Sequence, residues 1–363
     1  MSRIGRGVVG VAVTLALVPA GIASATATDP SPATTTTTTT SGSPTTVTTS
    51  ATTTTTTTST STTRLPPPFR QAKAKLKLST VGLYRVFHHL SSAAGRGVEI
   101  EGQLRPYVAG QFVIAKAWLG HRLIRSERVS VRRAGGASYG KFTFWVPKTG
   151  VGEVSVSVLH AASPEIGRAS ARTGYSALDT NVGFGSTGRF VVLIQQRLAA
   201  LHIYLPQTGV YDSGTGLAID AYHRLLGWGT SQSLDGGTIS YLLAGWGQFK
   251  VRYPHDGKHA EGNLGKQLLA LIRGSQVDVI YPISSGKPST PTVLGRFHVY
   301  RRVPGYQPDG MYFSSYFYTG YAIHGYDPAP DYPASHGCMR LPIQDALSVW
   351  GWINFGDGVD VYY

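Results

Sequence analysis

Short runs of hydrophobic and polar residues follow one another through the middle of the chain. Residues 98–104, 141–146 and 153–159 alternate between the two types, and residues 112–118 form a longer apolar run. Alternation with a period of two is typical of strands with one buried face, and glycine- or proline-containing turns separate the four segments. The pattern therefore predicts a β-sandwich module over residues 69–176.

The hydrophobic period then becomes helical. Residues 190–201 place apolar side chains at three- and four-residue spacing, which predicts an amphipathic helix. A second helix is expected over residues 217–226, and a third after the Asp/Gly turn at 234–238. Helices this short, joined by such turns, predict a compact three-helix bundle over residues 177–246.

The last part of the chain, residues 256–363, is again rich in β-type sequence. A helix is predicted over residues 344–352. Strands are predicted at residues 267–272, 277–283, 295–300, 312–318, 321–323 and 359–363. The chain as a whole is therefore predicted to be multidomain and mainly β.

The N-terminus reads as an export signal. Arg3 and Arg6 precede the uncharged apolar run Val8–Val18, and A-x-A cleavage sites follow, so residues 1–27 are predicted to be a secretory signal peptide. An uncleaved membrane anchor is the alternative. Residues 28–68, rich in threonine, lack the apolar side chains that a core requires and are predicted to form a disordered linker. We expect a secreted, extracytoplasmic protein.

The net charge of the chain indicates which class of polymer it would bind. The net charge of +14 favours anionic polymers as partners, whereas the predicted export and the lack of any nucleic-acid-binding motif argue against nucleic acid. Many arginines fall between residues 122 and 133, where a solvated strand face is the alternative to contact with an anionic wall polymer. No stable protein partner is predicted.

The chain has a single cysteine, Cys338, in the stretch YPASHGCMRLP. An unpaired cysteine in an exported protein is either a reactive thiol or a small buried hydrophobic residue. A thiol attacks as the thiolate, so it needs a base, and His336 and His324 are the neighbouring candidates. In a strand, His336 and Cys338 would share a face. A zinc site is not expected, because such sites require three or four suitably spaced ligands.

The segment from His324-Gly325 to Ser335-His336-Gly337-Cys338-Met339-Arg340 resembles the signature of the L,D-transpeptidase (YkuD-like) catalytic domain. Residues 283–292 resemble a further conserved stretch of that family. The resemblance implies a cysteine acyltransferase that needs no cofactor and forms 3→3 cross-links between peptidoglycan stem peptides. It also implies roles for individual residues. Cys338 is the expected nucleophile, and His324 is the expected base, oriented by the Gly325 carbonyl. His336, Gly337 and Ser335 are expected at the oxyanion site or in positioning, and Arg340 and Tyr318 in substrate binding.

Two further resemblances are weaker. The helical segment is similar to peptidoglycan-binding domain type 1, and residues 102–111 are similar to bacterial immunoglobulin-like modules. Two alternatives to the transpeptidase remain open. A carboxypeptidase would resolve the same thioester with water, and a wall-binding protein would have lost catalysis. The intact set of His324, Ser335, His336 and Cys338 argues against such a loss.

Overall fold

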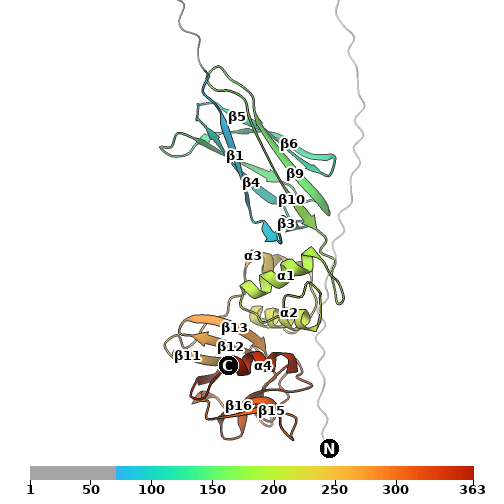
Figure 1. Cartoon of the computed structure of the whole chain (residues 1–363), viewed down its shortest axis with the longest axis vertical. Coiled ribbons are helices and arrows are strands. Elements are labelled where there is room, and N and C mark those ends of the chain that lie inside the picture. Colours follow the sequence, from blue (N-terminus) through green and yellow to red (C-terminus); the bar gives the residue numbers. More distant parts are fainter. Residues whose placement is uncertain (1–70) are drawn as a thin grey trace, which may run out of the picture. The chain divides into compact units, whose positions relative to one another are not determined.

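The computed structural model describes residues 71–363 (Figure 1). The predicted signal peptide and threonine-rich linker lie outside these residues. Within them, no helix has the length and the apolar character needed to cross a membrane.

Two β-sheets enclose one hydrophobic core in the N-terminal module. The first sheet has the order β1 (Lys75–Val81), β4 (Val98–Arg105), β8 (Gly140–Val146) and β7 (Arg132–Arg133), and the second has β2 (Tyr84–Val86), β3 (His89–Ala93), β10 (Ala169–Leu178), β9 (Gly152–His160), β5 (Phe112–Leu119) and β6 (Arg122–Ser130). All four predicted strands are present, as β4, β5, β8 and β9. Alternate residues of β4 and β8 are buried, which is the period-two pattern seen in the sequence.

Three helices follow: α1 (Arg189–Ala200), α2 (Ser213–Leu226) and α3 (Gly236–Ala244). The side chains of Asp212 and Asp235 accept the backbone N–H of Thr215 and Thr238, so each carboxylate caps the start of its helix. Because Asp212 caps it, α2 begins four residues before the predicted start. Gly227 and Gly245 adopt left-handed conformations and end α2 and α3.

The C-terminal module contains two further sheets and one helix. One sheet has the order β13 (Gln276–Pro282), β12 (Leu268–Arg273), β11 (Lys258–Asn263), β19 (Gly358–Tyr362) and β14 (Gly295–His298), and the other has β15 (Arg301–Tyr306), β16 (Tyr312–Tyr318), β17 (Tyr321–Gly325) and β18 (Met339–Leu341). The helix is α4 (Ile343–Trp352). The predicted elements are present, and β11, β15 and β18 are additional strands.

The three helices share a core with the five-stranded sheet. Leu268, Ala270 and Ile272 of β12 are fully buried in the same cluster as the apolar side chains of α1, α2 and α3. Arg224 of α2, itself buried, pairs with Asp220 at 2.6 Å and donates to the carbonyls of Gln267 and Ile283. The bundle is thus joined to the five-stranded sheet by apolar packing and by a buried ion pair.

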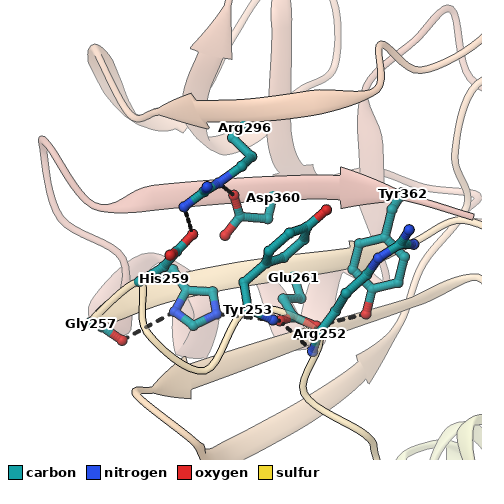
Figure 2. Close-up of polar contacts among 9 residues, drawn as sticks. Arg252, Tyr253, Gly257, His259, Glu261, Arg296, Asp360 and Tyr362 are labelled. Carbon is teal, nitrogen blue, oxygen red and sulfur yellow. Dashed lines mark hydrogen bonds and ion pairs between the residues drawn. The ribbon is translucent and has the colours of Figure 1, made fainter.

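A buried polar cluster on the same sheet holds the segment that leads from α3 into β11 (Figure 2). The Glu261 carboxylate accepts the backbone N–H groups of Arg252 and Tyr253 and the hydroxyl of Tyr362. The two ring nitrogens of His259 lie 3.1 Å from the Gly257 carbonyl and 3.4 Å from Glu261. Burial alone would lower the pKa of His259, but these acceptors raise it overall.

Substituting Arg224 tests the joint between bundle and sheet. Arg224→Leu removes the counter-ion of the buried Asp220 carboxylate, which keeps only the Ser231 N–H, and leaves the Ile283 carbonyl without a donor, so we expect it to lower the free energy of unfolding by about 3–5 kcal/mol. Urea unfolding measures the effect. The double variant Arg224→Leu/Asp220→Asn removes the stranded charge and is expected to recover part of the loss. A single variant as stable as the parent would contradict this account.

Candidate active site

Cys338 lies just before β18, against the four-stranded sheet. Its side chain packs with Ala322, Met311 and Tyr316, and its sulfur donates to the Gly320 carbonyl at 3.7 Å. β17 and β18 run parallel, with His324 opposite Arg340. Ala322 and His324 are two residues apart on β17 and therefore face the same side of the sheet. The topology thus brings Cys338 to the face that carries His324.

His324 is buried, with 2% of its surface exposed. Its Nδ1 lies 2.9 Å from the carbonyl oxygen of Gly325, so Nδ1 carries the proton and donates it. This hydrogen bond fixes the tautomer and leaves the lone pair of Nε2 free to accept a proton. Gly325 itself is constrained, because a Cβ there would lie 2.7 Å from the side chain of Ala346 in α4.

The turn before Cys338 is held by Ser335. Its hydroxyl donates to the Cys338 carbonyl at 2.6 Å and accepts the N–H of Gly337 at 3.0 Å. Gly337 has φ +120, and a Cβ there would lie 1.9 Å from the Tyr321 ring. Ser335 therefore fixes the backbone and bonds to neither histidine, and the Gly337 N–H is engaged in the turn.

A loop from β13 supports this turn. The backbone N–H of Lys287 donates to the Ser335 carbonyl at 3.0 Å, and the Thr290 hydroxyl donates to the same oxygen. Gly286 is required at this point, because a Cβ there would lie 2.3 Å from the Thr290 carbonyl. The stretch 283–292, noted in the sequence for its resemblance, thus forms the wall beside the cysteine turn.

His336 does not share the buried face. Its ring is exposed, and Nε2 lies 3.4 Å from Nζ of Lys287. The expectation that His336 and Cys338 share one face assumed a strand, but residues 335–338 form a turn in which Gly337 breaks the alternation. Of the two histidines, His324 is the one on the sheet face against which Cys338 packs.

The two substrate-binding candidates belong to different strands, Arg340 to β18 and Tyr318 to the end of β16. The Arg340 guanidinium stacks 3.9 Å from the centre of the Tyr326 ring, whose edge faces His324. Tyr318 is 43% exposed and packs against Phe297. The sequence analysis did not single out Tyr321 and Tyr326, although both flank His324 within three residues.

The electrostatics favour a neutral pair. Burial lowers the pKa of His324 to about 4, outweighing the opposite effect of the Gly325 carbonyl. Burial also raises the pKa of the Cys338 thiol above its ordinary value. At neutral pH the imidazole is therefore uncharged and the thiol protonated. Among residues 71–363, no cluster of three metal-binding side chains is present.

Comparison with known proteins identifies a family for this part of the chain. The profile of the YkuD family, described as the L,D-transpeptidase catalytic domain, matches residues 257–361. The L,D-transpeptidase from Xylanimonas cellulosilytica is 31% identical, and the alignment covers 97% of that chain and 50% of this one, with a TM-score of 0.47. The chain belongs to the L,D-transpeptidase family. Its transpeptidase domain contains every residue discussed above as part of the site.

Other solved L,D-transpeptidases are also similar. The catalytic domain from Enterococcus faecium is 26% identical, with 30% of this chain and 98% of that chain covered and a TM-score of 0.27. The enzyme from Stackebrandtia nassauensis is 18% identical over 51% of this chain and 96% of that one, with a TM-score of 0.32. No curated protein matches the chain.

The raised thiol pKa predicts how Cys338 reacts with iodoacetamide. Below its pKa the thiolate fraction grows about tenfold per pH unit, so labelling at pH 7 should be slower than that of free cysteine and should rise steadily through pH 9. Mass spectrometry measures the rate directly, because Cys338 is the only thiol. A plateau between pH 6 and 8 would show instead that the thiolate is already formed.

The glycine in the turn gives a second prediction. Gly337→Ala combines a left-handed φ with a clash against Tyr321, so we expect it to lower the free energy of unfolding by about 1–3 kcal/mol. Gly351→Ala is the control, because Gly351 lies in α4 with nothing near its Cβ position, and alanine favours a helix by about 0.8–1 kcal/mol. The two variants should shift the urea midpoint in opposite directions, and shifts of the same sign would refute the strain argument.

Proposed function

We propose that this protein is a cell-wall L,D-transpeptidase that forms 3→3 cross-links through a thioester on Cys338. The observation that carries the proposal is that the one thiol packs on the sheet face that also carries a histidine of fixed tautomer. His324 donates from Nδ1 to Gly325, so its Nε2 is the atom available to take a proton on the face where Cys338 lies. Family membership supplies the substrate class, the peptidoglycan stem peptide.

In the acylation step, Nε2 of His324 accepts the thiol proton as the sulfur attacks the carbonyl of the third stem residue, a diamino acid. The tetrahedral adduct collapses by breaking the bond to the terminal D-alanine, whose nitrogen takes the proton back from His324. The products are a thioester and free D-alanine. Because the resting pair is neutral, proton transfer accompanies the attack, and His324 acts as a general base rather than as one half of a preformed ion pair.

The oxyanion needs a backbone donor. The Gly337 N–H is engaged by Ser335. The N–H of Cys338 makes no hydrogen bond within the described part of the chain, so we assign the donor role to it. Removing one such donor typically costs about 2.7–4 kcal/mol of transition-state stabilisation. Ser335 acts by holding the turn that aims this N–H.

In the second half-reaction, the side-chain amine of another stem attacks the thioester and gives its proton to His324. A new amide bond forms and the sulfur leaves as the thiol. We assign contact with the stems to Tyr318, which is partly exposed, and to Arg340. Such a substrate lies outside the cytoplasm, which agrees with the export signal expected over residues 1–27 and the tether expected over 28–68.

Product analysis tests the proposal. The purified full chain is incubated with disaccharide-tetrapeptide, and mass spectrometry is expected to find a dimer that has lost one alanine. Cys338→Ala is expected to abolish it. Tripeptide monomer alone would indicate a carboxypeptidase, and unchanged tetrapeptide would favour the non-catalytic alternative.

The two histidines supply a matched pair for the same assay. His324→Gln is expected to lower turnover by on the order of 10²–10⁴-fold, the usual contribution of a general base. His336→Gln changes the same residue type two positions from the cysteine but at the exposed surface, and should lower turnover less than tenfold by the same reasoning. Equal losses in both variants would move the base role away from His324.

A further inference from the structure

The charge of the sandwich is one-sided. Between Gly102 and Gly152 the sequence contains nine lysines and arginines and one acidic residue, Glu127. The Glu127 carboxylate forms an ion pair with Arg125 at 2.6 Å. This stretch therefore carries a large excess of positive charge that its own carboxylates do not neutralise.

Several of these cations align on one face. In the four-stranded sheet, Lys77 of β1 is opposite Gln103 of β4, Gln103 is opposite Lys141 of β8, and Lys141 is opposite Arg132 of β7. The alternate residues of β4 and β8 are buried in the core, so these four side chains all lie on the outer face. They form an in-register row across the whole sheet, with neighbouring strands about 4.8 Å apart.

A second row lies beside the first. Lys75 is opposite Arg105, whose guanidinium stacks 4.5 Å from the centre of the Tyr139 ring. We call these two rows the basic face; its cations are Lys75, Lys77, Arg105, Arg132 and Lys141. All five are exposed, and within the described residues none of them forms an ion pair.

Arg132 and Lys141 also line a cleft. Its volume is about 410 Å³, and its other lining residues, Val129, Ser130, Phe142 and Thr143, carry no charge. Like charges directly opposite each other on neighbouring strands are destabilising, so this arrangement costs the free protein energy. An anion seated between the two side chains would remove the repulsion and gain charge-assisted hydrogen bonds.

We propose that the basic face binds a linear polyanion, a polymer with phosphate or carboxylate groups at regular intervals. The arrangement favours a polymer over a single anion because the first row places cations on β1, β8 and β7 and the second places cations on β1 and β4, so the charges extend along the sheet instead of surrounding one point. The inference does not rest on the catalytic proposal, since the basic face belongs to the sandwich and uses none of the residues around Cys338.

Long-chain inorganic polyphosphate, labelled with a fluorophore, is the probe, and fluorescence anisotropy with the full chain is the measurement. We expect binding that weakens with salt. In Arg132→Gln/Lys141→Gln the slope of log affinity against log salt should fall by about two, one for each lost contact. Because both positions are exposed, the double variant is expected to keep the urea midpoint of the parent, which urea unfolding verifies.

The matched control removes the same charges from the other sheet. Lys116 and Arg172 are both opposite Ser157 and lie exposed on the outer face of the six-stranded sheet. Lys116→Gln/Arg172→Gln should leave the slope nearly unchanged. Equal effects of the two double variants would mean that net charge alone attracts the polymer and would overturn the proposal. So would a lack of polyphosphate binding, or binding to vesicles of anionic lipid without binding to polyphosphate.

Discussion

The structure of the C-terminal half depends on β12 being buried on both faces. Leu268, Ala270 and Ile272 pack against the helices, while Leu269 and Leu271 pack into the core beneath the active-site sheet, and all five are fully buried. Fully burying a leucine or isoleucine side chain contributes about 1.5–3 kcal/mol, so one six-residue strand supports two cores. Removing the helices would expose one of its faces to water.

This arrangement changes how the helical segment should be understood. In sequence the helical segment resembles a separate binding domain. In the structure, part of its surface is buried against the five-stranded sheet, by apolar packing and by the Arg224–Asp220 pair. Any wall contact by the helices must use their remaining surface. The same helices that would bind the wall therefore also complete the fold of the catalyst.

How much of the fold the sequence could predict depended on what each strand buries. Strands with apolar inner faces, such as β4 and β8, were found from their alternation, and α2 and α3 from the Asp and Gly residues that bound them. β11 escaped prediction because its buried residues include His259 and Glu261, which look like surface residues. They tolerate burial because of partners far along the chain, among them Tyr362, which no local pattern reveals.

The candidate active site could likewise be predicted only in part. The turn at Cys338 was visible as a local motif, but the choice between two histidines depended on parallel pairing of β17 with β18 and on the conformation of Gly337. The burial of Cys338 has a chemical consequence. A thiol whose pKa is raised by burial has a smaller thiolate fraction, and the thiolate is the form that oxidants attack. Burial therefore leaves the single cysteine mainly as the thiol, the form that oxidants attack less readily.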